Sequence, residues 1–237
     1  MKLVLATHNR GKVRELQAMF IDMNSPGDAA GTVSIFDSDV NRTKRPPQLA
    51  QGGCTGPNNQ NVIDVLSLDD VPDAPEVVED GETYHENAVK KATALAEHTG
   101  YFALADDSGL EADALRGAPG IHSARYAGEH ASDSARINKL LDALKDVPDS
   151  QRTARFKCAI AIAAPTGQTQ VVVGVCEGKL IHSPRGQQGF GYDPIFVPAG
   201  FDKTFAELGV DVKNRISHRA KALEKLKKRL QMCISKP

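Results

Sequence analysis

The chain has 237 residues, and its 29 Lys and Arg residues nearly balance its 30 Asp and Glu residues. Because 41% of the residues are hydrophobic and 25% are charged, the composition is that of a globular protein and excludes disorder of the whole chain. The formal net charge of −1 removes any global electrostatic argument for binding to nucleic acid or a membrane surface.

The cysteine pattern indicates free thiols in a reducing compartment, and the apolar runs are too short for a signal peptide or a membrane span. Cys54, Cys158, Cys176 and Cys233 lie far apart and form no CxxC pair, which argues against a zinc site or a compact disulfide framework. The apolar run at residues 3–6 is shorter than the roughly 7 to 15 apolar residues of a signal peptide. No run approaches the roughly 20 residues of a membrane span. We therefore expect a cytoplasmic protein.

The N-terminal pattern predicts a strand, a loop and a helix. Residues 3–6 form the apolar strand, residues 7–12 are turn-like, and Val13, Leu16 and Phe20 recur at helical spacing. A loop between a strand and a helix presents backbone N–H groups at the positive end of the helix dipole. We expect this loop to bind an anion.

The segment from about residue 24 to residue 75 has a different composition from the rest of the chain. It is rich in proline, glycine and polar amides, and residues 41–61 contain almost no apolar side chain. This makeup predicts a surface insertion within a single domain of residues 1–237. Inside the insertion, residues 62–68 are interpreted as a strand or a helical turn.

Downstream of the insertion, hydrophobic spacing predicts a mixture of helices and strands. The predicted elements are a helix over about 87–97 that ends at Gly100, a strand over 102–105, a helix from Ser132 or Asp133 to about 144, strands over 155–163 and 171–176, and a helix over about 219–232. Because the elements do not alternate strictly, the pattern favours an α/β or α+β fold with a mixed sheet.

Two adjacent acids follow the predicted strand over residues 102–105. Asp106 and Asp107 stand before Ser108 and Gly109, and carboxylates at the end of a strand are suitable ligands for a hard cation. Since neighbouring strand residues point to opposite faces, we expect only one of the two acids to face the site. The alternative is a turn in which an Asp side chain bonds its own backbone, and the tetrapeptide alone does not decide between them.

A cluster of acids precedes the helix predicted over residues 87–97. Glu79, Asp80, Glu82 or Glu86 could complete a magnesium site with Asp107, because Mg²⁺ takes only one or two protein carboxylates and fills its shell with water and phosphate oxygens. For most of these acids the simpler interpretation is a solvated helix N-terminus, which favours negative charge.

A glycine-rich segment at residues 186–194 contains Phe190, Tyr192 and Asp193. An aromatic ring there could stack on a base while the carboxylate bonds the base edge. The segment is neither a Walker loop nor a dinucleotide fingerprint. From the residues alone, a tight, well-packed turn is the favoured interpretation.

The C-terminal region is strongly basic. Most of its charges are interpreted as a solvated helix face. Ser217, His218 and Arg219 differ because they precede the helix, where a hydroxyl cap, an imidazole and a guanidinium can converge on a ligand. With the acid pair, the anion-binding loop and the aromatic segment, they make a set of groups suited to nucleoside-triphosphate chemistry.

Seven short motifs, in order along the chain, resemble the inosine triphosphate pyrophosphatase family. They are Thr7-His8-Asn9-Arg10-Gly11-Lys12, Glu86-Asn87-Ala88, Ala105-Asp106-Asp107-Ser108-Gly109-Leu110, Gly117-Ala118-Pro119-Gly120, Ser123-Ala124-Arg125-Tyr126, Gly189-Phe190-Gly191-Tyr192-Asp193-Pro194 and Ser217-His218-Arg219. The motifs span nearly the whole chain apart from the insertion, which makes the chain roughly 40 residues longer than the family pattern.

The resemblance implies an α/β fold with a central mixed twisted sheet and two lobes that flank a long substrate cleft. It implies a homodimer that uses Mg²⁺ to convert inosine, deoxyinosine and xanthosine triphosphates (ITP, dITP and XTP) to the monophosphate plus pyrophosphate. This reaction would keep the non-standard purines out of DNA and RNA. The expected partner is the purine nucleoside triphosphate, without stable nucleic-acid binding or a membrane.

The resemblance also implies roles for individual residues. Asp107 is expected to accept a proton from the attacking water and to bind Mg²⁺ together with Glu79, for which Asp80 or Glu82 could substitute. The expected substrate-binding residues are Thr7, His8, Asn9, Arg10, Gly11, Lys12, Lys91, Ser108, Phe190, Gly191, Tyr192, Asp193, Lys213, His218 and Arg219.

The same residues suggest how adenine is rejected. Donors from His218 or Arg219 aimed at a 6-oxo group would meet a donor on adenine, and a buried donor without a partner disfavours the wrong base by orders of magnitude. The exclusion of guanine needs a further feature that these motifs do not contain.

Two rival functions are weighed against this one. The first is a related pyrophosphatase with another base preference. The second is a nucleic-acid or nucleotide-binding module that uses the basic C-terminal helix. The second rival predicts salt-dependent binding without turnover, and it leaves the Asp107 and Phe190 motifs unexplained.

Overall fold

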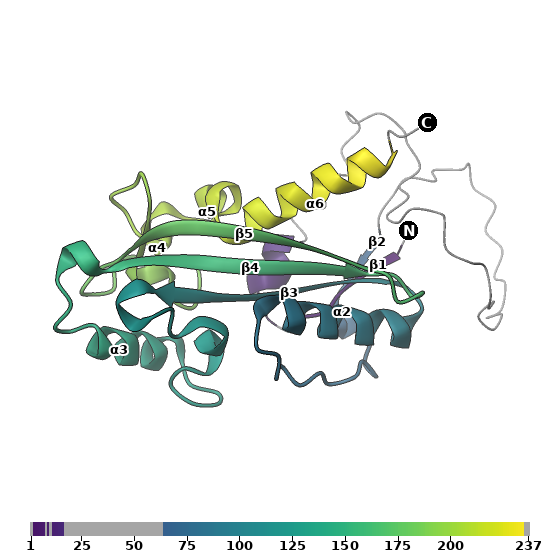
Figure 1. Cartoon of the computed structure of the whole chain (residues 1–237), viewed down its shortest axis with the longest axis horizontal. Coiled ribbons are helices and arrows are strands. Elements are labelled where there is room, and N and C mark those ends of the chain that lie inside the picture. The colour runs from purple at the N-terminus through teal and green to yellow at the C-terminus, as the bar shows by residue number, and fades with distance from the viewer. Residues whose placement is uncertain (1, 8, 10, 17–63, 235–237) are drawn as a thin grey trace.

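The computed structural model describes residues 2–7, 9, 11–16 and 64–234 (Figure 1). Within these residues the strands are β1 (Lys2–Leu5), β2 (Asp64–Leu66), β3 (Phe102–Ala112), β4 (Thr153–Ala163), β5 (Thr169–Leu180) and β6 (Phe196–Pro198). The helices are α2 (Tyr84–Thr99), α3 (Asp133–Ala143), α4 (Phe205–Leu208), α5 (Val210–Ile216) and α6 (His218–Ile234), and residues 11–16 are also helical.

The strands form one mixed sheet in the order β2-β1-β3-β4-β5-β6, as expected. β1 is parallel to β2 and β3, whereas β3, β4, β5 and β6 are antiparallel in sequence. β4 and β5 are longer than predicted, because they pair from Thr153↔Lys179 to Ala163↔Thr169 around the predicted turn. Backbone pairing therefore extends both strands over polar residues that the apolar pattern leaves out.

The two adjacent acids lie within β3 and do not follow it. The prediction of a strand that ends at residue 105 is therefore wrong, and so is the alternative of an Asp turn. Pairing with β4 continues through Asp106↔Ile160 and Asp107↔Ala159 to Ala112. The strand that ends at this level is β1, whose last pair is Leu5↔Leu104.

Most of the predicted insertion, and Phe20 of the first predicted helix, lie outside the described residues. Of the insertion's described part, Asp64–Leu66 forms β2, which confirms the strand interpretation of residues 62–68. β2 lies beside β1 in the central sheet, so the C-terminal end of the proposed excursion belongs to the core architecture.

The long strands β3, β4 and β5 run through both lobes of the molecule, and the helices gather around the two ends of the sheet (Figure 1). In one lobe, α2 covers one face through alanines such as Ala88 and Ala92, and α6 covers the opposite face through Leu223 and Leu226. In the other lobe, α3 and α4 pack around Phe196. The expectation of two lobes on a mixed sheet is confirmed. Among the described residues, no helix is both long enough and apolar enough to cross a bilayer.

Local signals set the helix boundaries. The Thr83 hydroxyl accepts from the Glu86 N–H at 3.1 Å and caps α2, and Gly100 ends that helix in the left-handed region at φ +68°. Ser132, not Asp133, caps α3, because its hydroxyl accepts from the Ala135 N–H at 3.2 Å. The Asp133 carboxylate is thus available for another contact.

The basic side chains of α6 cover the edge of β5. Three of them, spaced four residues apart, donate to alternate β5 carbonyls at 3.0, 2.7 and 3.0 Å, namely Lys221 to Val175, Lys225 to Val173 and Arg229 to Val171. Gly174 permits this contact, since a Cβ there would lie 2.0 Å from the His218 oxygen. These cations bond the carbonyls of the part of β5 that β6 does not pair, so they differ from the purely solvated face that we expected.

Arg152 ties α3 to the end of β5. Its buried guanidinium donates to the backbone oxygens of Leu144 and Leu180 at 2.8 and 3.0 Å, and of Ile181 at 3.3 Å. Buried carbonyls need donors, and one planar group supplies several at once.

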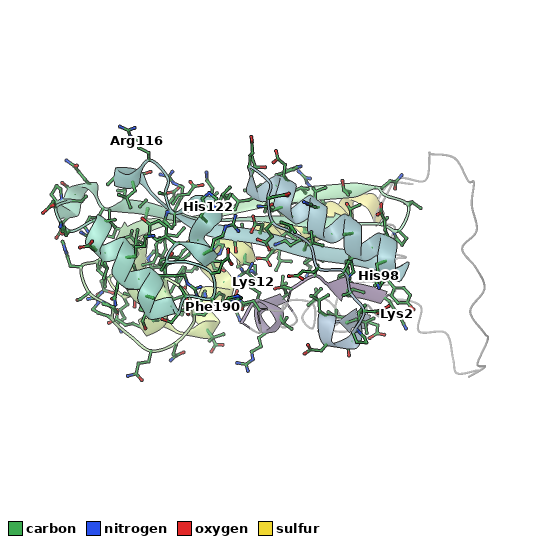
Figure 2. All side chains as sticks on the ribbon, turned by 90° about the horizontal axis from the view of Figure 1, so that it is seen from below. Lys2, Lys12, His98, Arg116, His122 and Phe190 are labelled. Atoms are coloured by element: carbon green, nitrogen blue, oxygen red, sulfur yellow. The ribbon has the colours of Figure 1, made fainter. Side chains whose placement is uncertain are left out.

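We expect Arg152→Met to lower the free energy of unfolding by about 3 kcal/mol, because it leaves buried carbonyls without donors. Urea denaturation measures the change. Arg116→Met is the matched control, because Arg116 points away from the molecule (Figure 2) and its loss should change stability by less than about 0.5 kcal/mol. Equal losses in the two variants would contradict this account of Arg152.

Candidate functional site

A cavity of about 510 Å³ lies beside β3, between the two lobes. It begins where β1 ends, just past the bond from the Ala6 N–H to the Leu104 oxygen at 2.8 Å. From there β3 continues without β1 at its side. Residues of β3 that point to either face can therefore reach the open edge.

The cavity brings together almost all the predicted site residues. Its wall includes Thr7, Asn9, Lys12, Glu79, Lys91, Asp107, Ser108, Phe190, Gly191, Tyr192, Asp193, Lys213, His218 and Arg219. Figure 2 shows Lys12 and Phe190 near the middle of the long axis. Gly11 lies behind the wall, where a Cβ would be 2.7 Å from the Phe190 ring. The remaining two predictions, His8 and Arg10, lie outside the described residues.

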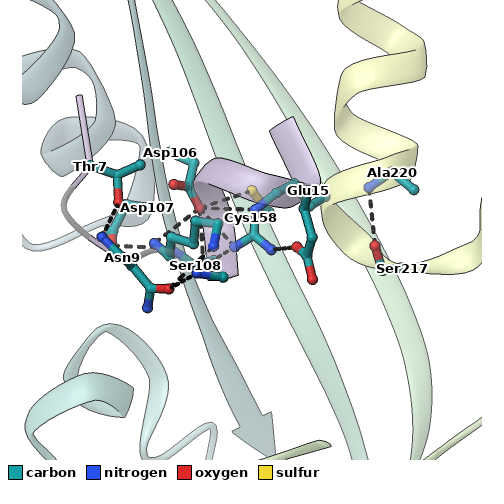
Figure 3. A network of polar contacts seen from close by, with 12 residues as sticks. Thr7, Asn9, Glu15, Asp106, Asp107, Ser108, Cys158, Ser217 and Ala220 are labelled. Atoms are coloured by element: carbon teal, nitrogen blue, oxygen red, sulfur yellow. Dashed lines mark hydrogen bonds and ion pairs between the residues drawn. The ribbon is translucent and has the colours of Figure 1, made fainter. Parts of the chain in front are cut away.

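The loop before the first helix is organised by Asn9 (Figure 3). Its side-chain oxygen accepts from the N–H groups of Gly11 and Lys12 at 2.9 and 3.2 Å, and the Thr7 hydroxyl accepts from the Asn9 N–H at 3.2 Å. The N–H groups of Gly11 and Lys12 are thus already used by an N-cap, and the expectation that the loop binds an anion stays a prediction. Among the described residues of the loop, Lys12 brings a charged group to the cavity.

Asp106 is buried directly behind the cavity wall. Its Oδ2 lies 3.0 Å from Lys12 Nζ and 2.9 Å from Arg219 Nη2. Burial alone would raise the pKa of Asp106, but Lys12, Arg219 and Lys91 outweigh it and hold the pKa well below its usual range. Asp106 is therefore a fixed anion.

Asp107 points to the opposite face and lines the cavity. Its carboxylate accepts from Asn87 Nδ2 at 3.1 Å and from the Ser108 N–H at 3.0 Å, and Lys91 Nζ lies 3.9 Å away. Burial raises the pKa of Asp107, and the nearby Glu79 charge adds to the effect against the lowering by Lys91. A carboxylate with a raised pKa is a better proton acceptor.

Of the four acids that the sequence offered for the metal site, Glu79 is the one that lines the cavity, and Glu76, which was not among them, lines it as well. Glu79 Oε1 lies 2.9 Å from Lys91 Nζ, and the same ammonium donates to the Asp106 backbone oxygen at 2.7 Å. Asp80 instead forms an exposed pair with Lys90 at 2.5 Å. Glu86 accepts from the Glu82 N–H at the start of α2, as expected of a helix N-terminus. Glu79 is therefore the predicted acid that lies near Asp107, because both carboxylates lie within 4 Å of the Lys91 ammonium.

The donor set near Lys91 suits a hard divalent cation. Asp107 and Glu79 supply carboxylate oxygens from two elements, and both lie close enough to contact one ammonium. In the described part of the chain no group of three or more His, Cys, Asp or Glu side chains could hold a metal. Two carboxylates fit Mg²⁺, which completes its shell with water and phosphate oxygens, better than a transition metal.

A buried chain of alternating charges runs through the site. It connects Lys12, Asp106, Arg219, Glu15, Lys213 and Asp193 in that order. Glu15 accepts from Arg219 and lies 3.1 Å from Lys213 Nζ. Our sequence analysis missed this acid, because it follows the motif of residues 7–12 by one helical turn and no local pattern marks it.

Aromatic rings form the other part of the wall. Lys213 Nζ lies 4.1 Å from the centre of the Phe190 ring, a cation–π contact. The His218 ring stacks on Phe156 at 4.8 Å, and burial lowers the pKa of His218 well below its usual value, so the ring is neutral. Within the described structure, His218 Nδ1 is buried without a hydrogen-bond partner. Such an atom suits a ligand group.

The model of the Ham1 family matches residues 3–229. The chain belongs to the Ham1 family. A dITP/XTP pyrophosphatase of Desulforamulus reducens is 46% identical over 225 residues, which cover 95% of this chain and 93% of that protein. A dITP/XTP pyrophosphatase of Bacillus subtilis is 51% identical over 168 residues, which cover 71% of this chain and 85% of that protein. The solved structure of a HAM1 protein from Coxiella burnetii gives a TM-score of 0.75 at 36% identity, covering 98% and 99% of the two chains.

We expect Asp106→Asn to lower the free energy of unfolding of this Ham1 protein by about 3–5 kcal/mol, because Lys12 and Arg219 lose a buried anion. Chemical denaturation measures the loss. The control is Asp113→Asn, which removes a surface partner of Arg155 at 2.7 Å and should cost at most about 1 kcal/mol. A loss of that small size for Asp106→Asn would show that the buried pair does not hold the site.

Proposed function

We propose that this chain hydrolyses non-standard purine nucleoside triphosphates, ITP, dITP and XTP, to the monophosphate and pyrophosphate. One observation carries the proposal. A single cavity has in its wall the carboxylate of Asp107, the cations Lys12 and Lys91 and the aromatic ring of Phe190. The names of the relatives, dITP/XTP pyrophosphatase, support the same reaction.

Lys12 and Lys91 are the cations for the phosphate chain in this proposal. Asp106 holds the Lys12 ammonium at 3.0 Å, and its backbone oxygen holds that of Lys91 at 2.7 Å. Both ammonium groups are thus fixed before substrate arrives. Fixed positive charge stabilises the negative charge that develops on the leaving pyrophosphate without reorganisation.

Asp107 acts as the general base. Its carboxylate takes a proton from a water molecule, the water oxygen forms a bond to the α-phosphorus, and the bond from that phosphorus to the bridging oxygen breaks. The electron pair of the broken bond leaves with pyrophosphate. Asn87 and the Ser108 N–H hold the carboxylate in orientation for this transfer.

Asp107 and Glu79 are the residues that would hold Mg²⁺ when it is bound. The ion would neutralise charge on the phosphate oxygens. Lys91 contacts Glu79 and lies near Asp107. When no ion is bound, its positive charge reduces the repulsion between the two carboxylates.

Phe190 and His218 select the base in this proposal. The Phe190 ring offers a surface on which a purine can stack. His218 is the better donor to a 6-oxo group, because the Arg219 guanidinium is already bonded to Asp106, Glu15 and Ser108. A neutral imidazole that donates to inosine would face a donor on adenine, which disfavours adenosine triphosphate.

We expect Asp107→Asn to lower the kcat for ITP by about 10²–10⁴-fold, the usual effect of losing a general base. Pyrophosphate release from ITP and from adenosine triphosphate measures the activity and the base preference. Asp80→Asn is the control, because Asp80 forms only an exposed pair outside the cavity and should leave the rate unchanged. Equal release from both nucleotides by the native chain would overturn the proposed base preference.

A chelator should abolish pyrophosphate release, and added Mg²⁺ should restore it. We expect Glu79→Gln to raise the Mg²⁺ concentration for half-maximal rate by about 10–100-fold, because one of only two protein ligands becomes neutral. Glu82→Gln, from the same acidic segment but outside the cavity wall, should leave the concentration unchanged. An unaltered Mg²⁺ requirement in Glu79→Gln would assign the second ligand elsewhere.

A further inference from the structure

Carboxylates from two different elements hold the backbone on both sides of Phe190. The Phe190 N–H donates to Asp193 Oδ2 at 2.9 Å, and the Gly191 N–H donates to Asp133 Oδ2 at 2.6 Å. Both peptide groups that flank the aromatic residue are therefore fixed. The glycines on either side, Gly189 and Gly191, have φ of +82° and +61°, a backbone that glycine adopts freely and that gains order from such bonds.

The two carboxylates differ in what holds them. Asp193 belongs to the buried charge chain and bonds Lys213. Asp133 is the first residue of α3, and its second oxygen is bonded by Arg136, one turn further along the helix. Arg136 Nη1 also donates to the Ala124 oxygen at 2.7 Å. The loop is thus tied through α3 to the segment Gly120–Arg125.

These contacts lie in the wall of the cavity. Ala124, Asp133, Arg136 and Gly191 all line it. Tyr192 adds a second tie to the same segment, since its hydroxyl donates to the Ser123 oxygen at 3.0 Å. The Asp133 bond therefore acts where the aromatic ring meets the bound molecule.

The helix does not require Asp133 as its cap, because Ser132 fills that position. The Asp133 side chain is 42% exposed, so its removal uncovers little surface and breaks only a partly solvated ion pair. Its bond to Gly191 nonetheless joins residues 58 positions apart in the sequence. The main effect of this bond is therefore to hold the loop around Phe190 in place.

We propose that Asp133 is a positioning residue for base recognition. Arg136 holds its carboxylate, and the carboxylate fixes the Gly191 peptide and so the angle of the Phe190 ring. The inference rests on the proposed function, in which Phe190 stacks on the purine. Asp133 contacts the loop and not the phosphate-binding residues, so its effect belongs to the base half of the substrate alone.

The first test separates the base from the phosphates. Asp133→Ala should raise the KM for ITP about tenfold, the effect of one charge-assisted hydrogen bond, and leave kcat within about threefold. The inhibition constant of inorganic tripolyphosphate, which lacks a base, should stay unchanged. Asp133→Asn, which keeps a neutral acceptor, should give an intermediate KM.

Ser134→Ala, at the next and exposed position of α3, is the matched control and should retain the native KM. A native KM in Asp133→Ala overturns the proposal. So does a parallel rise of KM and of the tripolyphosphate inhibition constant, because that result would show a general disturbance of the cavity.

A second test does not depend on turnover. The chain contains no tryptophan, so Phe190→Trp introduces a single fluorescent reporter at the ring position. Acrylamide should quench this reporter more strongly in Phe190→Trp with Asp133→Ala than in Phe190→Trp alone, and equal quenching overturns the proposal. Stronger quenching in a chain that does not hydrolyse ITP would support the role of Asp133 and overturn the proposed function instead.

Discussion

The site depends on the buried carboxylate of Asp106. A buried anion is unfavourable unless cations and donors surround it, and Asp106 has Lys12, Arg219 and the Ser108 hydroxyl within 3.3 Å. The acid and the cations need each other, because leaving the charges of Lys12 and Arg219 without the Asp106 carboxylate is unfavourable as well. Neither cation can leave without exposing the other charges, so both stay fixed beside the cavity.

The same electrostatic constraint links the two lobes. Arg219 lies in the first turn of α6, which packs on the lobe that contains β1, and it bonds Glu15 of the first helix. Glu15 in turn contacts Lys213 of α5, and Lys213 reaches Asp193 at the other end of the cavity. Opposite charges alternate along this path, so each member is stabilised by its neighbours. A cavity between lobes can therefore keep its shape while its wall remains polar.

The sequence predicted the local elements better than their extent. The alanine spacing and Gly100 located α2, and the apolar runs located β4 and β5, because burial on one face leaves a periodic pattern. The continuation of β3 through Asp106 and Asp107 was missed, since it depends on the partner strand and not on hydrophobicity. Pairing between distant strands leaves no local signal.

The candidate site was found through motifs, and its supporting residues were not. Asp107 stands out in the sequence because it follows an apolar run, and His218 because it lies at the start of a predicted helix. Glu15 does not, and the motif that contains Asn87 does not indicate its partner, because a buried Glu–Arg pair or an Asn–Asp bond appears only when distant segments meet. The loop of residues 7–12 shows the converse. The sequence indicates a loop with free backbone N–H groups, but it does not indicate that the Asn9 side chain accepts from two of them, those of Gly11 and Lys12.

The alternation of a β-strand explains how adjacent acids acquire opposite properties. Asp106 points to the face of Lys12 and Arg219, where the cations depress its pKa and fix its charge. Asp107 points to the face of α2, where burial and Glu79 raise its pKa. The backbone thus places a fixed anion one residue away from a carboxylate with a raised pKa, and Asp107 lines the cavity just past the end of β1. A one-residue shift of β3 against β4 would exchange the two environments, so the register of the central strands fixes which acid is the buried anion and which faces the cavity.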